Sequence, residues 1–258
     1  MNDQVREFLS SFKEVRLLTE ERGILWQDAS SMGVSRSWFE LSRISPEDRI
    51  EFTKEFWLTR LALHVSATPA IEQFFSKLDD IALIATRQTT EEPWRIELIY
   101  SLGDNSSFFR GLPPASTGHI EAFQATFDVR LPRDYCAFFH LHNGFGKLTE
   151  TGLLPLEEIK GVSQRLIQRI LGAHTPLRFN DALFDPHLLV PFYEEYGIES
   201  FQCFNADWYP SSEMGNVHFS SIDWTLSDVT ERNAWAEELA YPTFLEWLAA
   251  FLHGMNGS

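Results

Sequence analysis

The spacing of apolar residues predicts a helix at the start of the chain. Within residues 1–20, apolar side chains recur at intervals of three and four, which places them on one helical face. This stripe consists of Val5, Phe8, Leu9, Phe12 and Val15. Residues 23–43 mix Ser, Gly and scattered aromatic residues, and they predict no regular element.

Two further helices begin at recognisable start signals. The run SPED, which opens residues 45–64, offers a capping Ser, a Pro at the first helical position and two acids that complement the helix dipole. We expect this helix to bury Ile50, Trp57 and Leu61. Thr68-Pro69 repeats the start signal. The apolar stripe after it consists of Ile71, Phe74, Phe75 and Leu78.

A β-hairpin is predicted after these helices. Residues 80–86 are short and apolar, and residues 94–100 mostly alternate between apolar and charged, as in a half-buried strand. Gly and Pro then cluster over residues 111–118 and indicate a domain boundary. The chain is thereby divided into an N-terminal α+β extension of unknown family, residues 1–110, and a second domain, residues 113–258.

The second domain mixes helices with short strands. Helical spacing predicts helices at 119–127, 132–142 and 157–171 and a terminal helix from Pro242 to Gly254. Strands are predicted at 187–193, 200–205 and 216–220, with loops at 207–213 and 223–227. This order of helices, strands and a closing helix is typical of an α+β domain.

The composition is that of a globular chain, with 44% hydrophobic and 22% charged residues. The first residues lack the basic head and apolar stretch of a secretion signal, and no apolar run approaches the roughly 20 residues of a membrane span. The two cysteines, Cys136 and Cys203, are too few for a disulfide scaffold. We therefore expect a cytoplasmic protein.

The net charge is −16, and the excess of acid is concentrated late in the chain. Residues 1–112 carry 13 basic and 18 acidic residues, whereas residues 113–258 carry 8 and 19. From Asp181 onward, 13 acidic residues face a single basic one, Arg232. Such a surface repels nucleic acid and anionic membranes, and it speeds the encounter with a basic protein.

The stretch LPRDYCAFFHLHNGF, residues 131–145, holds the only reactive constellation of the sequence. On a helix, Cys136 and His140 are four residues apart, so they could form a nucleophile and its base or two ligands of a metal. However, no Gly-rich turn precedes Cys136, and no companion metal ligands stand elsewhere at suitable spacing. A core helix is the favoured interpretation.

Other enzyme signatures are missing. The sequence contains no GxGxxG, Walker, GxSxG or HExxH motif, and we expect no cofactor and no bound metal. Two acidic pairs, Asp181/Asp185 and Glu194/Glu195, stand in a strongly acidic segment, where solvated surface is the favoured interpretation.

The same stretch resembles the first motif of the SUKH superfamily, the Smi/Knr-type cell-wall regulators and bacterial toxin-immunity domains. In those domains a Leu-Pro-x-Asp-Tyr start is followed by an aromatic or Leu and by an Asn-Gly that closes the helix. Further segments at 119–129, 152–159, 188–205, 215–223 and 242–252 resemble the family's elements in the same order. The motif residues here are Leu131, Pro132, Asp134, Tyr135, Phe138, Asn143 and Gly144.

The resemblance covers roughly residues 113–253 and implies an α+β domain with a mixed sheet backed by helices, here preceded by a helical region with a β-hairpin. It also implies a non-enzymatic role. Bacterial members are mostly immunity proteins that neutralise a cognate toxin in the cytoplasm, and fungal members regulate cell-wall synthesis through protein contacts. One departure is YEEYG at 193–197, where the family often has a turn rich in Gly and Asp.

Three hypotheses follow. The first is an immunity-like protein whose acidic surface binds a protein partner, such as a basic toxin domain, and binds neither nucleic acid nor membrane. Its binding residues would lie in loops that combine acids with aromatic side chains: Asp207, Trp208, Tyr209, Glu213, Asp223 and Trp224. The second is a regulatory adaptor or scaffold in which residues 1–110 make one contact and the SUKH-like half another. The third is an enzyme that uses Cys136 with His140 or one of the acidic pairs.

Overall fold

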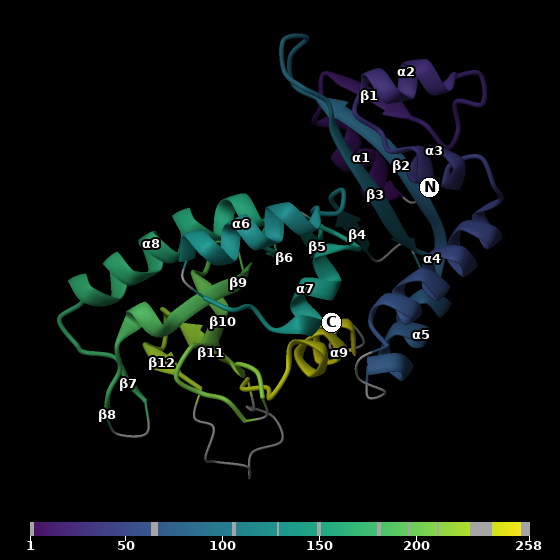
Figure 1. Cartoon of the computed structure of the whole chain (residues 1–258). Helices are drawn as coiled ribbons and strands as arrows, with labels where there is room; N and C mark the ends of the chain where they lie inside the picture. The colour runs from purple at the N-terminus through teal and green to yellow at the C-terminus, as the bar shows by residue number, and fades with distance from the viewer. Residues whose placement is uncertain are drawn as a thin grey trace.

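Helices pack on both faces of one β-sheet that runs through most of the chain (Figure 1). The computed structural model describes residues 3–62, 67–104, 107–127, 129–148, 151–179, 182–195, 197–210, 212–227 and 239–253. Within them, ten strands form the sheet in the order β1-β2-β3-β4-β5-β6-β9-β10-β11-β12. A separate two-stranded hairpin joins β7 and β8.

The helices are α1 (Asp3–Ser10), α2 (Trp26–Ser31), α3 (Arg36–Leu41), α4 (Pro46–Arg60), α5 (Thr68–Ser76), α6 (Thr117–Phe127), α7 (Arg133–Phe139), α8 (Leu156–Gly172), the 3-10 helix η2 (Pro186–Leu188) and α9 (Phe244–His253). The strands are β1 (Glu14–Leu17), β2 (Leu78–Arg87), β3 (Arg95–Leu102), β4 (Phe108–Gly111), β5 (Phe145–Lys147), β6 (Thr151–Leu153), β7 (Arg178–Phe179), β8 (Ala182–Leu183), β9 (Leu189–Glu195), β10 (Ser200–Asn205), β11 (Asn216–Ser220) and β12 (Thr225–Leu226).

The predicted α+β class is confirmed, with one difference in the sheet. Every strand pairing in the described residues is antiparallel, where a mixed sheet was expected. Most neighbours in the sheet are also consecutive strands in the chain, although α2 to α5 lie between β1 and β2, and α6 and α7 lie between β4 and β5. The exception is β6 to β9, where α8 intervenes and packs on β9.

The central hairpin of β2 and β3 is buried on both faces because its side chains alternate between two cores. Ile81, Leu83 and Ala85 belong to the main core, which the apolar residues of α4 and α5 also join. Ala82 and Ile84 belong to a smaller core under α1. The N-terminal helix therefore covers the face of the hairpin opposite α4 and α5.

The main core crosses the predicted boundary at 111–118. Strand β4 pairs with β5, which places the extension and the second domain in one sheet. The Trp57 ring of α4 lies 5.6 Å from the ring of Phe138 and 5.4 Å from that of Phe145, measured between centroids. Helix α9, near the C-terminus, packs against both α5 and α7. The division into two domains stays a prediction, but the two parts share a core.

The N-terminal helix is shorter than expected. The prediction of a helix throughout residues 1–20 was wrong after Ser10, because residues 14–17 form strand β1 and pair with β2. The hydroxyls of Ser10 and Ser11 donate to the carbonyls of Glu7 and Phe8. These are carbonyls in the last turn of the helix, where backbone donors are missing. Pairing with a long neighbouring strand overrides the local helical spacing.

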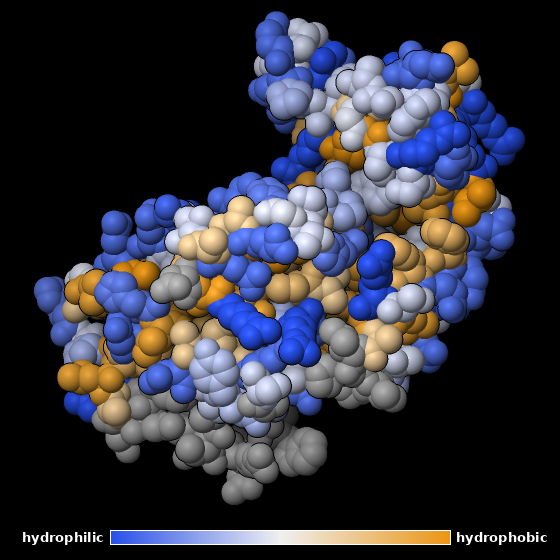
Figure 2. Space-filling view, in the orientation of Figure 1, coloured by the Kyte–Doolittle hydropathy of each residue, from blue (hydrophilic) through white to orange (hydrophobic). Residues whose placement is uncertain are grey.

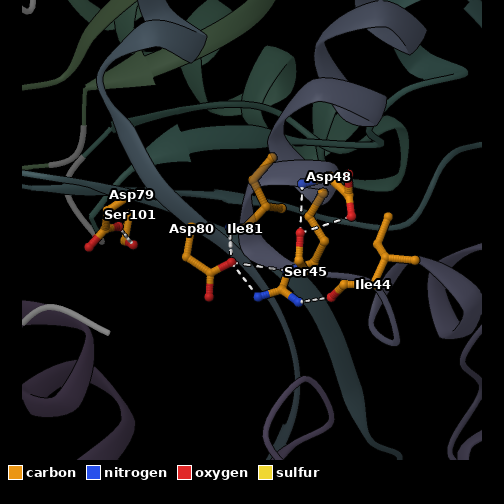
Figure 3. A network of polar contacts seen from close by, with 8 residues as sticks. Ile44, Ser45, Asp48, Asp79, Asp80, Ile81 and Ser101 are labelled. Atoms are coloured by element: carbon orange, nitrogen blue, oxygen red, sulfur yellow. Dashed lines mark hydrogen bonds and ion pairs between the residues drawn. The ribbon is translucent and has the colours of Figure 1, made fainter.

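Helix α4 is fixed to the sheet by a buried arginine. The Ser45 hydroxyl accepts a hydrogen bond from the Asp48 amide, as its capping role predicts. One turn further on, the Arg49 guanidinium donates to the Asp80 carboxylate of β2 at 2.6 and 3.0 Å and to the Ile44 carbonyl at 2.6 Å (Figure 3). The Arg49 side chain is only 6% exposed, so this ion pair is shielded from solvent.

We predict that Trp57→Ala lowers the free energy of unfolding by about 3–5 kcal/mol, because it empties a buried space between the two parts of the chain. Urea unfolding followed by circular dichroism would measure this loss. The matched control is Phe52→Ala on the same helix, whose side chain is 63% exposed and whose loss should cost about 0.5 kcal/mol or less. Equal effects of the two variants would contradict the shared core.

Candidate protein-binding site

The acidic residue of the SUKH-like motif ties two helix starts together. Asp134 lies in the first turn of α7 and is 3% exposed. Its Oδ1 accepts from the Tyr135 amide at 2.9 Å, and its Oδ2 accepts from the Leu245 amide at 3.0 Å. The amide of Leu245 is one of those that the start of α9 leaves without a helical partner, so Asp134 caps α9 from a distance in sequence of over 100 residues.

The aromatic residues of the motif form the core between α7, the sheet and α9. The Tyr135 ring is fully buried among those of Phe192, Phe204 and Phe244, with centroid distances of 5.0–5.6 Å for the two strand residues and 4.9 Å for the helix residue. Phe138 packs 5.5 Å from Phe244. Leu131 and Pro132 before them are also buried. These side chains supply packing area and are closed to any ligand.

The Asn-Gly pair of the motif begins the next helix. Asn143 Oδ1 accepts from the Leu156 amide at 2.9 Å, and its Nδ2 donates to the Glu157 carboxylate at 3.0 Å, so it caps α8. Gly144 has a φ of +111°, and a Cβ there would lie 3.1 Å from a Leu112 methyl. The chain can therefore turn from α7 into β5 only with a residue that tolerates this geometry.

The cysteine within residues 131–145 does not have the environment of a nucleophile. Cys136 is partly buried, and this burial, together with the negative charges of Glu213 and Asp134, raises the pKa of its thiol to about 11. The thiol is therefore protonated at neutral pH, whereas attack requires a thiolate. His140 follows the last residue of α7, and no hydrogen bond between the two side chains is found in the described part of the chain.

The other histidine of the stretch is a core residue. His142 is 2% exposed, and burial lowers its pKa to about 4. Its Nδ1 lies 2.9 Å from the Leu112 carbonyl and its Nε2 lies 2.6 Å from the Tyr100 hydroxyl. A neutral ring that donates from Nδ1 and accepts at Nε2 satisfies both contacts. The sequence did not indicate this pair, because the two residues meet only through the strand order.

The predicted partner-binding residues fall into two groups at opposite ends of β11. Asp207, Trp208, Tyr209 and Glu213 lie in the loop before this strand, and Asp223 and Trp224 lie in the turn after it. A strand of this length spans about 13 Å at a rise of ~3.3 Å per residue. The structure therefore does not bring all six side chains into one cluster.

Within the first group, two side chains have structural contacts and two face solvent. The Trp208 ring covers Gly215 so closely that a Cβ there would lie 2.4 Å from the ring. Glu213 accepts from the Arg133 amide at 2.6 Å, at the start of α7, and also pairs with the Arg133 guanidinium. Asp207 is exposed, and Tyr209 is 56% exposed. These two are the members of the group that a partner can reach.

The side chains of the second group also make structural contacts. The indole N–H of Trp224 donates to the Thr175 carbonyl at 2.9 Å and thereby holds the segment that leads to β7. Asp223 is exposed, but its carboxylate also accepts from the Ser220 hydroxyl at 3.1 Å. This group closes a turn as well as presenting a charge.

Arginines of α8 neutralise part of the acidic segment. Arg165 pairs with Glu194 at 3.4 Å, and Arg169 pairs with Glu199 at 2.7 Å. Asp185 binds the neighbouring His187 ring at 2.7 Å, while Asp181 lies outside the described residues. The local balance is therefore less negative than the sequence count indicates, and the exposed Asp207 stands apart from these pairs.

Within the described residues, no helix is long and apolar enough to cross a bilayer. In the same residues, His, Cys, Asp and Glu side chains do not gather in groups of three or more that could hold a metal ion.

We predict that Asp134→Ala lowers the free energy of unfolding by about 1–3 kcal/mol, because it leaves the buried Leu245 amide without an acceptor. Chemical unfolding of the purified variants would measure the loss. Glu121→Ala on α6 is a suitable control, since its side chain is exposed and its loss should cost about 0.5 kcal/mol or less. An unchanged midpoint for Asp134→Ala would contradict its role as a cap for α9.

We also predict slow alkylation of Cys136 in the folded protein. With a pKa near 11, the thiolate fraction at pH 8 is on the order of a hundredfold below that of an ordinary cysteine. Iodoacetamide labelling with peptide mapping would compare the folded and the urea-unfolded chain. The folded-state rate should rise with pH toward about 11. Fast labelling at neutral pH would revive the nucleophile hypothesis.

The chain matches the model of a known protein family. The model of the SMI1 / KNR4 family (SUKH-1) matches residues 114–250, which include the whole stretch 131–145. A search of curated proteins found no match. The match covers more than half of the chain and agrees with the resemblance on sequence over residues 113–253. The chain therefore belongs to the SMI1 / KNR4 family, SUKH-1.

Proposed function

We propose that this chain is a non-catalytic protein-binding module that acts in the cytoplasm as an immunity-like protein and neutralises a cognate toxin. Membership of the family is consistent with an immunity-like or a regulatory role. The toxin as partner and the surface that binds it are our proposals.

The observation that carries the proposal is that the polar and reactive side chains of residues 131–145 do not converge on one open space. Asp134 and Asn143 cap helices, His142 is buried and neutral, and the Cys136 thiol is protonated. A catalytic set requires such groups to converge on a space that a substrate can enter. In this stretch they are spread over helix ends and the core, which supports a binding role.

The proposed binding surface includes the loop before β11. Tyr209 offers an exposed ring and Asp207 an exposed carboxylate, a combination that supplies contact area together with electrostatic attraction. The net charge of −16 favours a basic partner and makes the encounter faster at low ionic strength. A basic toxin domain, such as a nuclease, fits this description.

We predict that the purified chain captures a basic protein that is encoded next to its own gene. Raising the salt concentration from about 50 mM to about 500 mM should release this protein, because salt screens the attraction between surface charges strongly above about 0.1 M. Affinity capture followed by mass spectrometry would identify the protein, and co-expression would show whether the chain relieves its toxicity.

The double variant Asp207→Asn/Tyr209→Ser tests the loop before β11, because it changes two exposed side chains and should preserve the fold. It should weaken the capture of the partner about fivefold or more. Recovery of no protein by the wild type at low salt, or of a partner that is acidic and held equally at high salt, would overturn the proposal.

A further inference from the structure

A pocket of about 170 Å³ opens between α3 and α4, far from the loops on β11. Its walls are mostly apolar, and residues from both parts of the chain line it. Trp38 and Leu41 of α3 face Phe52 and Phe56 of α4 across it. Pro114 and Leu141, from the second domain, close one side together with His142. The N-terminal extension and the family domain therefore build this pocket jointly.

The lip of the pocket exposes aromatic rings to solvent. Phe52 is 63% exposed and Phe56 is 38% exposed, and the two are four positions apart on the same face of α4. The Arg60 guanidinium lies 5.3 Å from the Phe56 ring. Figure 2 shows hydrophobic side chains at the surface over α4 and α5. Exposed rings beside an apolar hollow are the usual anatomy of a contact surface.

The inner wall holds a polar atom that has no partner. Thr53 is 5% exposed and lines the pocket, and its hydroxyl makes no hydrogen bond within the described residues. The Tyr100 hydroxyl and the His142 ring, which also line the pocket, satisfy each other. A buried hydroxyl without a partner costs free energy, but this oxygen is shielded from solvent, so the interaction that the pocket offers is apolar contact.

The size of the pocket distinguishes between classes of occupant. Small-molecule and cofactor sites usually enclose about 300–1,000 Å³, which is larger than this space. An apolar cavity of about 150 Å³ holds a benzene ring. A single aromatic or branched aliphatic side chain is therefore the unit that fits, as in the anchor pocket of a protein interface.

The charges around the pocket favour a basic partner. Glu47, Asp48, Glu51 and Glu55 are all exposed on α4. Arg49 is buried on Asp80, so Lys54, which pairs with Glu51, and Arg60, which lies beside Phe56, are the basic residues that oppose these four acids. The helix surface beside the exposed rings therefore keeps an acidic excess, which complements lysines or arginines that flank an apolar side chain.

We infer that this pocket is a docking site for a basic segment of the protein partner, which inserts one large apolar side chain between α3 and α4. The inference rests on the proposed function and adds a role for the N-terminal extension. The partner then contacts the chain at two places, the loop before β11 and this pocket.

A synthetic peptide tests the pocket without the natural partner. The probe is a fluorescein-labelled helical peptide of Lys and Ala with one central Trp, and its control has Ala in place of the Trp. Fluorescence polarisation on the full chain should show binding of the Trp peptide only. Phe52→Ser should weaken that binding about tenfold. The matched control is Leu171→Ser on α8, where a side chain of similar exposure, 61%, is removed.

Equal binding of the two peptides, or an unchanged affinity of Phe52→Ser, would overturn the inference. So would a wild-type chain that is dimeric in light scattering and becomes monomeric with Phe52→Ser, because a second copy would then be the occupant. A captured natural partner separates the two proposals. If wild type and Phe52→Ser hold it equally, the proposed function stands and the pocket is not its dock; if neither variant captures a partner, the proposed function fails.

Discussion

A single buried carboxylate organises the C-terminal half of this protein. Asp134 would be costly to bury without partners, and it is stabilised by backbone amides at the starts of α7 and α9. Because both helix starts carry partial positive charge, the carboxylate also suits their dipoles. Its position fixes α9 against α7, and this contact closes the aromatic core around Tyr135.

Asn143 repeats this arrangement at α8. Its side chain reaches the first residues of that helix, while Gly144 allows the chain to turn directly into β5. One short stretch therefore sets the positions of three helices relative to the sheet. This explains physically why a stretch rich in reactive residue types forms a scaffold: most of their polar atoms are already engaged by the backbone.

The N-terminal extension completes the same structure. Strand β4 of the extension adds to β5 of the family domain, and Trp57 of α4 lies among aromatic rings from both parts. The pocket between α3 and α4 follows from this joint core, because its floor and walls come from both sides of the predicted boundary. The extension thus offers a binding surface that the family domain alone would lack.

The sequence predicted those elements whose own spacing or start signals define them. Helix α4 follows its Ser-Pro start, and strands β2 and β3 follow their apolar runs. The short strands β4 and β5 carry no such signal, since three or four residues show little periodicity and form only through their neighbours. Strand β1 was misassigned for the same reason, because its pairing with β2 outweighs the local helical pattern.

Candidate site residues were harder to predict than elements. Exposed acids and aromatic residues could be recognised by type, yet Trp208, Glu213 and Trp224 use their side chains to hold neighbouring segments. The exposure of Phe52 and Phe56 was also not evident, because apolar residues on a helix are ordinarily assigned to the core. Both outcomes depend on tertiary contacts between segments that are distant in sequence.

The proposed partner binds the outer surface of this protein, while the core of α7 serves the fold. Amide hydrogen exchange of the full chain, with and without its captured partner, tests this claim most directly. We expect new protection in the loop before β11 and along Phe52–Phe56 of α4, with the exchange of residues 135–139 unchanged. New protection confined to residues 135–139 would contradict this claim.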